Sequence, residues 1–339
     1  MKCLTSIITL AVLSITTVFA RPTQVGTTSF AGLKYRLYTD GKATIYGTSY
    51  NHIQSTTIPA SVTYQNKQYL VSEIAAESFV DKEVNKLYVD GGNTGLLIKK
   101  NAFYGMRGLK EFGIYSKYVT AEIGGFNGVG NFVEFLGEGI PNIVDDYSEK
   151  LLKQWDLPVR KNYKYVNNWE RMQELFTLGK RVQETFGIYD KVANPANAAN
   201  VMFIGAGSSN GVSRVYRLLA IAMGIPHTEV LVGSDNIYYS WNYVKIDIGD
   251  GKGTKWYIFD IIQDKIGKNT SWNLSAFKTD SQQVNKLKKF YGEFYTINAN
   301  NFVVFTNRYN YPNESRVNDT AGVNFNTWLK NNNAGERAK

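Results

Sequence analysis

The sequence has very few of the side chains that carry thiol and metal chemistry. Among 339 residues there is one cysteine, Cys3, and there are two histidines, His52 and His227. A single cysteine excludes an internal disulfide, so the fold must be stabilised by packing. Neither histidine has a second histidine, a cysteine or an acidic cluster nearby, and no aspartate-rich loop has calcium-binding spacing. We therefore predict no metal site and no cofactor.

The first 20 residues have the form of a secretory signal peptide. Lys2 supplies the charged start, 4–18 is an apolar run, and Val18-Phe19-Ala20 ends on a small residue suited to cleavage. A retained membrane anchor is the alternative, but the run is short and partly polar for a span. We expect a secreted protein with no membrane span, whose mature chain lacks Cys3 and any thiol nucleophile. Residues 21–29 are polar and are expected to form a flexible leader.

The chain carries 38 basic and 29 acidic residues, a net charge of +9. A basic secreted protein is drawn to anionic surfaces such as cell-wall polymers, acidic glycans and acidic proteins, although many soluble proteins are basic without such a partner. No nucleic-acid-binding motif accompanies the charge, so we expect no nucleic-acid partner. No Leu-Pro-x-Thr-Gly wall-sorting signal is present, and we expect the protein to be released or only loosely held at the cell surface.

A repeat with a period in the low twenties runs through the β-rich region 30–140. Its marker is a phenylalanine preceded by an isoleucine: Phe79, Phe103 and Phe126 follow one another at intervals of 24 and 23 residues. A short strand-like run follows each of them, at 86–89, 111–114 and 132–135. This period is typical of leucine-rich solenoids, in which each turn buries its apolar positions against the next.

The pattern I-x-x-x-A-F, with a strand roughly ten residues later, is similar to the BspA-type leucine-rich repeats of bacterial surface proteins. The resemblance covers 30–140 and implies a solenoid that adheres to matrix or host proteins. Residues 35–46 and 64–71 are expected to form a capping hairpin. Alternatively, the segment 57–62 resembles a sequence that commonly lies between repeats in this family, in which case the repeats begin near Ala43. Because the repeats are divergent, an irregular β-domain is the alternative.

The chain changes character after the repeats. Residues 141–164 are charged and contain two prolines, and we expect a junction there. Region 165–310 has helical and strand-like patterns and is predicted to be a second domain, whereas 311–339 is asparagine-rich and is expected to be a flexible tail. The overall expectation is an α+β protein in which a short β-rich repeat solenoid precedes an α+β domain.

Three blocks between residues 205 and 264 share the order and spacing of a known catalytic core. They are Ser209-Asn210-Gly211-Val212-Ser213, opening an amphipathic helix that ends at Met223-Gly224-Ile225, then Tyr239-Ser240-Trp241-Asn242, then Trp256-Tyr257-Ile258-Phe259-Asp260. These blocks resemble the transglutaminase-like superfamily of papain-like thiol enzymes, which reads C-x-G-Y-A, then L-G-I, then H-A-W-N, then W-Y-x-x-D. The resemblance implies a transglutaminase-like α+β domain over 165–310.

The catalytic positions of that family are altered here. Ser209 stands at the nucleophile position, Tyr239 at the base position and Asp260 at the acid position, so only the acid is kept. A serine hydroxyl needs a base, and tyrosine, which titrates at about pH 10, is a protonated donor at neutral pH. If a loop over 248–253 closes the hairpin, Asp260 lies opposite Trp241, and a hydrogen bond between Asp260 and Tyr239 follows. We therefore predict a pseudoenzyme.

Four residues around these positions are candidates for a retained binding cleft: Ser208, Asn210, Trp241 and Trp256. Two interpretations of the helix start stay open. Either Ser209 simply caps its helix, or the unpaired N–H groups of the first turn hold a glutamine-like, peptide or acidic ligand. The two tryptophans match framework aromatics of the family and are expected in the core. His227, which follows a proline, is expected to be a turn residue.

The leading hypothesis is a secreted, non-catalytic two-domain protein that binds a host or cell-surface protein or glycan. The alternative is a serine-dependent hydrolase or acyltransferase, with Ser209 as nucleophile, Tyr239 and Asp260 assisting, and helix N–H groups binding the oxyanion. A third hypothesis is a structural or immune-facing antigen with no specific ligand. The sequence leaves the ligand and the oligomeric state open.

Overall fold

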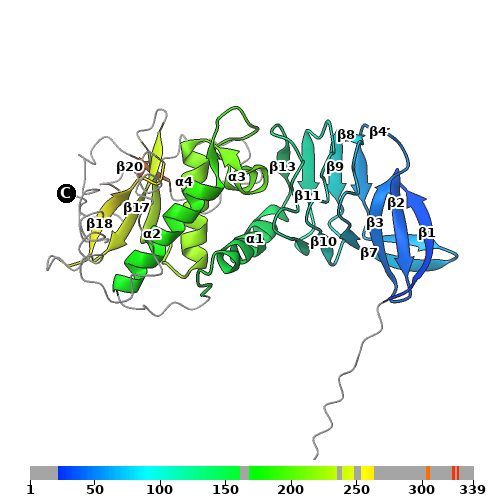
Figure 1. The fold of residues 1–339 in the computed structure, drawn as a ribbon, viewed down its shortest axis with the longest axis horizontal. Coiled ribbons are helices and arrows are strands. Elements are labelled where there is room, and N and C mark those ends of the chain that lie inside the picture. The colour runs from blue at the N-terminus through cyan, green and yellow to red at the C-terminus, as the bar shows by residue number, and fades with distance from the viewer. Residues whose placement is uncertain are drawn as a thin grey trace, which may run out of the picture.

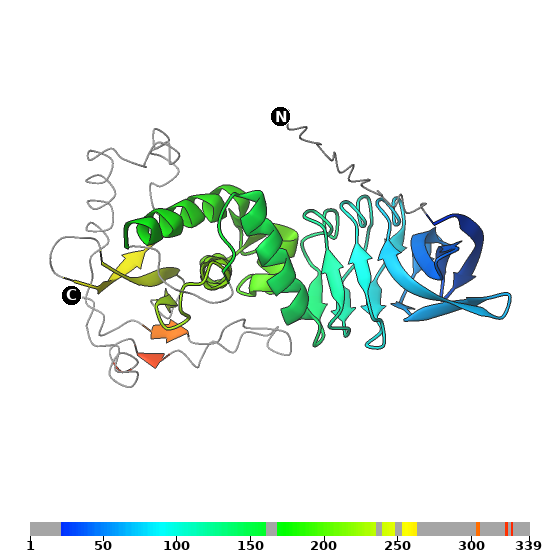
Figure 2. The ribbon, with the colours of Figure 1, turned by 90° about the horizontal axis from the view of Figure 1, so that it is seen from below.

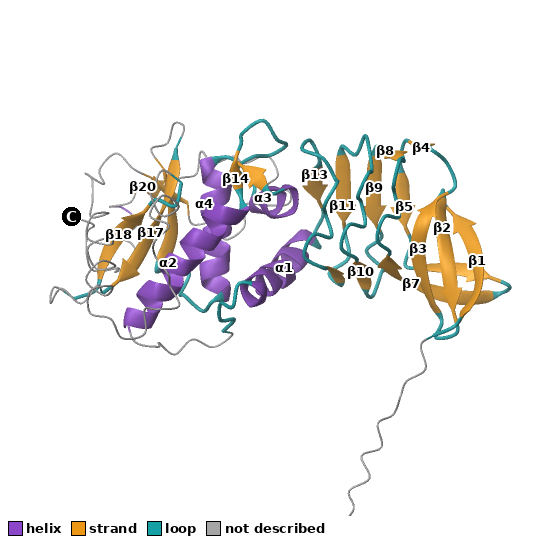
Figure 3. Cartoon of the chain, in the orientation of Figure 1, coloured by secondary structure: helices purple, strands orange, loops and turns teal. Residues whose placement is uncertain are grey.

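The computed structural model describes residues 22–160, 168–234, 239–247, 253–262, 303–305, 323–324 and 327. The protein is elongated, with strands at one end, helices in the middle and a second sheet at the far end (Figure 1, Figure 3). It is a mixed fold of α-helices and β-strands with the β-rich part first, as the sequence predicted. The predicted signal peptide lies outside the described residues. Within them, no helix combines the length and the apolar character that crossing a membrane requires.

An antiparallel meander begins the described chain. Strands β1 (Gln24–Phe30), β2 (Leu33–Tyr38) and β3 (Lys42–Thr48) pair in sequence order. Ala31 and Gly32 join β1 to β2 with φ values of 50° and 79°, the left-handed geometry of a tight hairpin. The expected flexible leader at 21–29 is therefore wrong, because these residues form most of β1. An edge strand has little to bury, which explains its polar sequence.

Ten short strands follow and build a solenoid. They are β4 (His52–Ile53), β5 (Thr56–Ile58), β6 (Ser61–Tyr64), β7 (Lys67–Ile74), β8 (Glu83–Val84), β9 (Lys86–Val89), β10 (Leu96–Ile98), β11 (Glu111–Ile114), β12 (Val119–Ala121) and β13 (Glu134–Leu136). One parallel ladder runs β3–β7–β10–β12 and a second runs β5–β9–β11–β13 (Figure 2). Each turn of the chain therefore contributes one strand to each ladder.

The register of the first ladder repeats from turn to turn. Ile45 pairs with Ile74, Ile74 with Ile98, and Ile98 with Ala121. The ladder starts where β3 meets β7, at Lys42, so the repeats begin near Ala43, which was one of the two starts considered. The capping hairpin expected from 35–46 and 64–71 is present only in part. Residues 35–46 lie in the antiparallel pair β2–β3, and 64–71 lies in a separate antiparallel pair, β6–β7, whereas β3 and β7 pair with each other in parallel.

The repeated phenylalanines stack inside the solenoid. The ring centroids of Phe79 and Phe103 are 5.6 Å apart, and those of Phe103 and Phe126 are 6.1 Å apart, with interplanar angles of 21° and 20°. All three side chains are at most 1% exposed. Because every turn places the same residue at the same depth, each ring covers the one before. The repeat interval in the sequence therefore corresponds to one turn of the solenoid, and each turn adds one phenylalanine to the stack.

Helix α1 (Ile140–Gln154) closes the C-terminal end of the solenoid. It packs against β12 (Figure 2). The Lys150 ammonium donates to the Ala121 carbonyl at 2.8 Å, and the Gly124 N–H donates to the Tyr147 hydroxyl at 3.0 Å. Side chains of α1 thereby satisfy backbone groups at the outer edge of the last turn. The predicted junction at 141–164 is therefore a packed cap as far as the end of α1.

The remaining elements form a second α+β part. They are α2 (Asn168–Thr185), β14 (Gly187–Ile188), α3 (Ala198–Ile204), β15 (Ala206–Gly207), α4 (Ser209–Ala222), β16 (Val230–Ser234), β17 (Ser240–Ile246), β18 (Lys255–Phe259), β19 (Val303–Phe305) and β20 (Val323–Asn324). The sheet has the antiparallel order β18–β17–β16–β19–β20. α4 is buried along nearly its whole length and contacts α1, α2, α3, β16 and β17. The helix expected to open at Ser209 is present as α4, and α2 supplies a further helix in the region where helical patterns were expected.

The two parts share one hydrophobic core. Phe203 on α3 stacks on Phe126 with a centroid distance of 4.0 Å and an angle of 27°. The Asn200 side-chain amide donates to the Val133 carbonyl at 2.8 Å and is fully buried. The second part therefore adds one more ring to the stack of the solenoid, and the boundary between the predicted domains is packed rather than open.

Candidate functional site

Three elements bring the predicted catalytic positions together. Ser209 is the first residue of α4, Tyr239 immediately precedes β17, and Asp260 immediately follows β18. β17 and β18 pair in a register that sets Asn242 opposite Phe259, and the next step along the strands carries Asp260 opposite Trp241. The register predicted from the hairpin length is confirmed. Because α4 packs against β17, the helix start and the two strand ends lie in one region.

The Tyr239 hydroxyl donates a hydrogen bond to the Asp260 carboxylate. Its oxygen lies 2.7 Å from Oδ1 and 2.9 Å from Oδ2. Oδ1 also accepts the Ile262 N–H at 3.0 Å, which holds the carboxylate against its own turn. The Tyr239 carbonyl accepts from the Ser234 hydroxyl at 2.8 Å. The predicted hydrogen bond is present, and it directs the phenolic proton at a carboxylate.

Ser209 serves as a hydrogen-bond acceptor inside the fold. The residue is 6% exposed, and its Oγ accepts the Ser240 N–H at 3.1 Å. Beside it, the Asn210 side-chain amide donates to the Ser240 hydroxyl at 3.2 Å and accepts from Arg214 Nε at 2.6 Å. Ser240 therefore ties the start of α4 to the start of β17. Ser240 was not among the predicted site residues, and the sequence marks it only by its position next to Tyr239 in the second block.

The N-cap of α4 is Ser208, so the interpretation of Ser209 as the cap is wrong by one residue. The Ser208 hydroxyl accepts the Gly211 N–H at 3.4 Å, and its backbone is extended. The Pro195 carbonyl accepts both the Ser208 N–H at 2.8 Å and the Ser208 hydroxyl at 3.2 Å. A Cβ on Gly211 would lie 2.2 Å from the same oxygen. Ser208 is thus a structural residue, and the Pro195 loop packs closely on the first turn.

The two tryptophans lie in the core. Trp256 is fully buried, which leaves it no surface for a ligand and corrects its place among the cleft candidates. Trp241 is 6% exposed, with its ring 6.3 Å from that of Tyr239 and 6.0 Å from that of Tyr243. Burial raises the pKa of Tyr243, so this hydroxyl also keeps its proton. Both tryptophans are therefore buried, as expected, and Trp241 packs between the rings of Tyr239 and Tyr243.

The histidines lie away from these residues. His52 is exposed on β4 with Nδ1 3.4 Å from the Glu83 carboxylate, and His227 is exposed in the turn before β16. Neither faces Ser209. In the part of the chain that the structure describes, no three His, Cys, Asp or Glu side chains gather as a metal site would require.

Replacing Tyr239 by phenylalanine is expected to lower the free energy of unfolding by about 1–2 kcal/mol, because a hydrogen bond to a partly exposed carboxylate is lost. Urea denaturation would measure the change. The matched control is Tyr189→Phe, at a 46% exposed tyrosine in the same half, for which we expect less than about 0.5 kcal/mol. Equal stabilities for Tyr239→Phe and the unaltered protein would show that the pair does not hold this region.

No family model and no curated protein matches the chain. A leucine-rich cell-surface protein of Faecalibacterium prausnitzii A2-165 is similar in structure, with 23% identity and a TM-score of 0.23; the similarity covers 34% of this chain and 34% of that one. A leucine-rich-repeat protein of Bacteroides capillosus ATCC 29799 has 19% identity and a TM-score of 0.23, over 33% of this chain and 99% of that one. Both are leucine-rich proteins, and neither match shows a transglutaminase-like domain.

Proposed function

We propose that this protein is a secreted, non-catalytic binding protein that joins leucine-rich repeats to a degenerate transglutaminase-like domain. The observation that carries the proposal is the hydrogen bonding at Ser209, Tyr239 and Asp260. Three positions that resemble a catalytic triad converge, yet each side chain is engaged in holding the fold.

The chemistry of these groups argues against catalysis. Acyl transfer by a serine needs a neighbouring base that accepts the hydroxyl proton near neutral pH. The Tyr239 hydroxyl donates a hydrogen bond to the Asp260 carboxylate, so it offers no base to Ser209. The Ser209 oxygen is buried and accepts a backbone N–H, which leaves little room for a substrate carbonyl.

The binding half of the proposal is supported by the solenoid. Repeat solenoids present long, regular surfaces on which partners dock. This one exposes large aromatic side chains, Tyr50, Tyr104, Tyr118 and Phe132 among them, and single exposed aromatics of this kind are frequent contacts in protein interfaces. With a net charge of +9, the partner would be a host or cell-surface protein or glycan.

The purified mature protein is expected to show no labelling by a fluorophosphonate probe, and neither amine incorporation into glutamine peptides nor peptide hydrolysis, from mildly acidic to mildly alkaline pH. The control is the double variant Ser209→Cys with Tyr239→His, which restores the residue types of the resembled family. Activity in the double variant alone would support a core that has lost its chemistry. Labelling or turnover by the unaltered protein that is lost in Ser209→Ala would contradict the proposal.

The binding half is tested separately, by titrating the mature protein over immobilised matrix and plasma glycoproteins. Saturable binding to at least one of them is expected. Its absence across the panel would favour an antigen without a specific ligand.

A further inference from the structure

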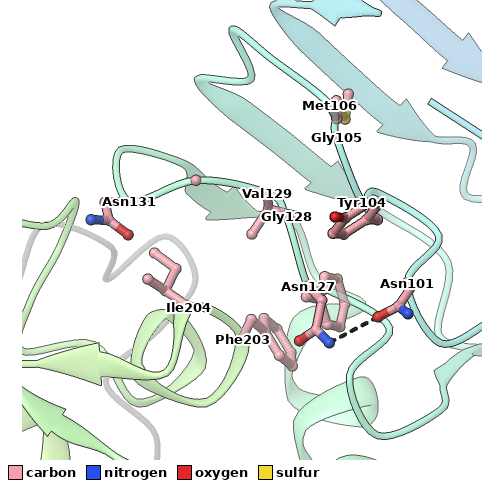
Figure 4. A pocket seen from close by; sticks show the side chains of 12 residues that line it. Asn101, Tyr104, Gly105, Met106, Asn127, Gly128, Val129, Asn131, Phe203 and Ile204 are labelled. Atoms are coloured by element: carbon pink, nitrogen blue, oxygen red, sulfur yellow. Dashed lines mark hydrogen bonds between the residues drawn. The ribbon is translucent and has the colours of Figure 1, made fainter. Parts of the chain in front are cut away.

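A pocket of about 620 Å³ opens where the last two repeat loops meet α3. The loop at 101–106 forms one side, the loop at 126–131 forms the centre, and the end of α3 forms the other side (Figure 4). Its lining includes Asn101, Tyr104, Asn127, Asn131 and Phe203. Its volume falls within the range of small-ligand sites.

The pocket has an aromatic and aliphatic floor with a rim of amides. Phe126 and Phe203, which stack at 4.0 Å, contribute to the floor. At the rim, the Asn127 side-chain amide donates to Asn101 Oδ1 at 2.9 Å (Figure 4). Tyr104 beside them is 57% exposed. An exposed ring next to fixed amide groups offers both an apolar face and directed hydrogen bonds.

The walls are fixed before any ligand arrives. The Ala193 N–H donates to the Asn131 carbonyl at 2.8 Å, which ties the central loop to the second part of the protein. Gly128 has a φ of 92°, and a Cβ there would lie 2.5 Å from the Phe103 carbonyl oxygen, so the two repeat loops nest closely. A site that is formed in advance spends less free energy on ordering when a ligand binds.

The pocket is uncharged although the protein is strongly basic. None of its twelve lining residues is Asp, Glu, Lys, Arg or His, whereas 20% of the chain is charged. An anionic ligand would find no cationic side chain there, and a buried or half-buried charge without a charged partner is costly. The chemistry therefore selects a neutral ligand that is rich in hydrogen-bonding groups and has an apolar face.

We propose that this pocket binds a neutral oligosaccharide. A pyranose ring has a face of C–H groups that can lie on the Tyr104 ring, and hydroxyls at its edge that pair with the Asn101, Asn127 and Asn131 amides. A neutral peptide fits less well, because peptides bind most readily along a free strand edge. This pocket is lined by loops in which Gly105, Gly128 and Gly130 all have positive φ. The inference rests on the proposed function, of which it names the ligand class and the site.

The test uses the purified mature protein on an array of neutral and acidic glycans. Saturable binding to neutral glycans is expected, and raised salt should not weaken it because no ion pair is involved. Tyr104→Ala should weaken binding about tenfold or more through loss of the aromatic face. Asn131→Trp should abolish it by filling the pocket from its exposed rim. The control Tyr189→Ala, at a 46% exposed tyrosine outside the pocket, should change the affinity by less than about twofold.

Three results would overturn the inference: no neutral glycan bound, binding confined to acidic glycans and lost at high salt, or binding that survives both pocket variants. If neutral peptides bind, and Tyr104→Ala weakens their binding to the same extent, the ligand of the pocket is a peptide and the oligosaccharide proposal is wrong. The matrix and plasma glycoprotein titration separates this inference from the function it rests on. If the unaltered protein binds that panel but no neutral glycan on the array, the pocket inference fails and the binding function stands. If the unaltered protein binds neither array nor panel, both fail.

Discussion

Replacing Phe126 by alanine is expected to lower the free energy of unfolding by about 3–5 kcal/mol, the largest stability loss we predict for a single substitution in this protein. The side chain is 1% exposed, and its ring lies 6.1 Å from Phe103, 5.5 Å from Phe135 and 4.0 Å from Phe203. Removing it leaves a cavity bordered by rings from both parts of the chain. The neighbouring rings are held by their own turns and can close only part of it.

Urea denaturation followed by circular dichroism and by tryptophan fluorescence would measure this loss. The repeats and the second part should lose stability together, because the missing ring lies between them. The control is Phe132→Ala, the same change at a phenylalanine that is 71% exposed, for which less than about 0.5 kcal/mol is expected. A Phe126→Ala protein as stable as the control, or one in which only the repeats are weakened, would contradict a shared core.

Replacing Gly211 by alanine is expected to destabilise the protein by about 1–3 kcal/mol, although the same change inside a helix usually stabilises it. A Cβ at this position would lie 2.2 Å from the Pro195 carbonyl oxygen and 2.7 Å from Val201 Cγ2. That carbonyl also accepts the Ser208 N–H at 2.8 Å, so it cannot move away without breaking a hydrogen bond of the helix cap. The loss should appear as a lower thermal midpoint.

The matched control for this variant is Gly95→Ala. Gly95 is exposed and does not have a positive φ, and a Cβ there would meet no heavy atom within 4 Å beyond its chain neighbours. Its replacement should be neutral, or stabilising by up to about 1 kcal/mol through the unfolded state. If the two variants have the same thermal midpoint, then the close approach of the Pro195 carbonyl does not explain why position 211 is a glycine.

The repeats were predictable because identical residues recur at a nearly constant interval. Phe79, Phe103 and Phe126 mark equivalent positions, and equivalent positions in a solenoid must stack. The contact between Tyr239 and Asp260 was predictable for a different reason: loop length fixes the register of a hairpin, and register fixes which side chains meet.

Other features depend on contacts that no local pattern reveals. β1 is polar because it is an edge strand, so its sequence has the composition of a leader. α1 does bury residues at helical spacing, but Pro141 and the charges around it favoured a junction. Phe203 joins the stack from a distant helix, and its partner could not be read from its neighbours. The pocket likewise forms where three segments from different repeats and helices meet.

The meander and α1 each pack on one particular terminal turn of the solenoid, whereas the interior turns share the same register. Ile74, Ile98 and Ala121 occupy the same place in successive turns, so an extra turn copied into the middle would find a matching register on both sides. The meander at one end and α1 at the other would remain in place. Duplication within the interior of the array would lengthen the molecule by about 4.8 Å per added turn without baring a strand edge. The length of the solenoid can therefore change from within, while the pocket and the second part stay as they are.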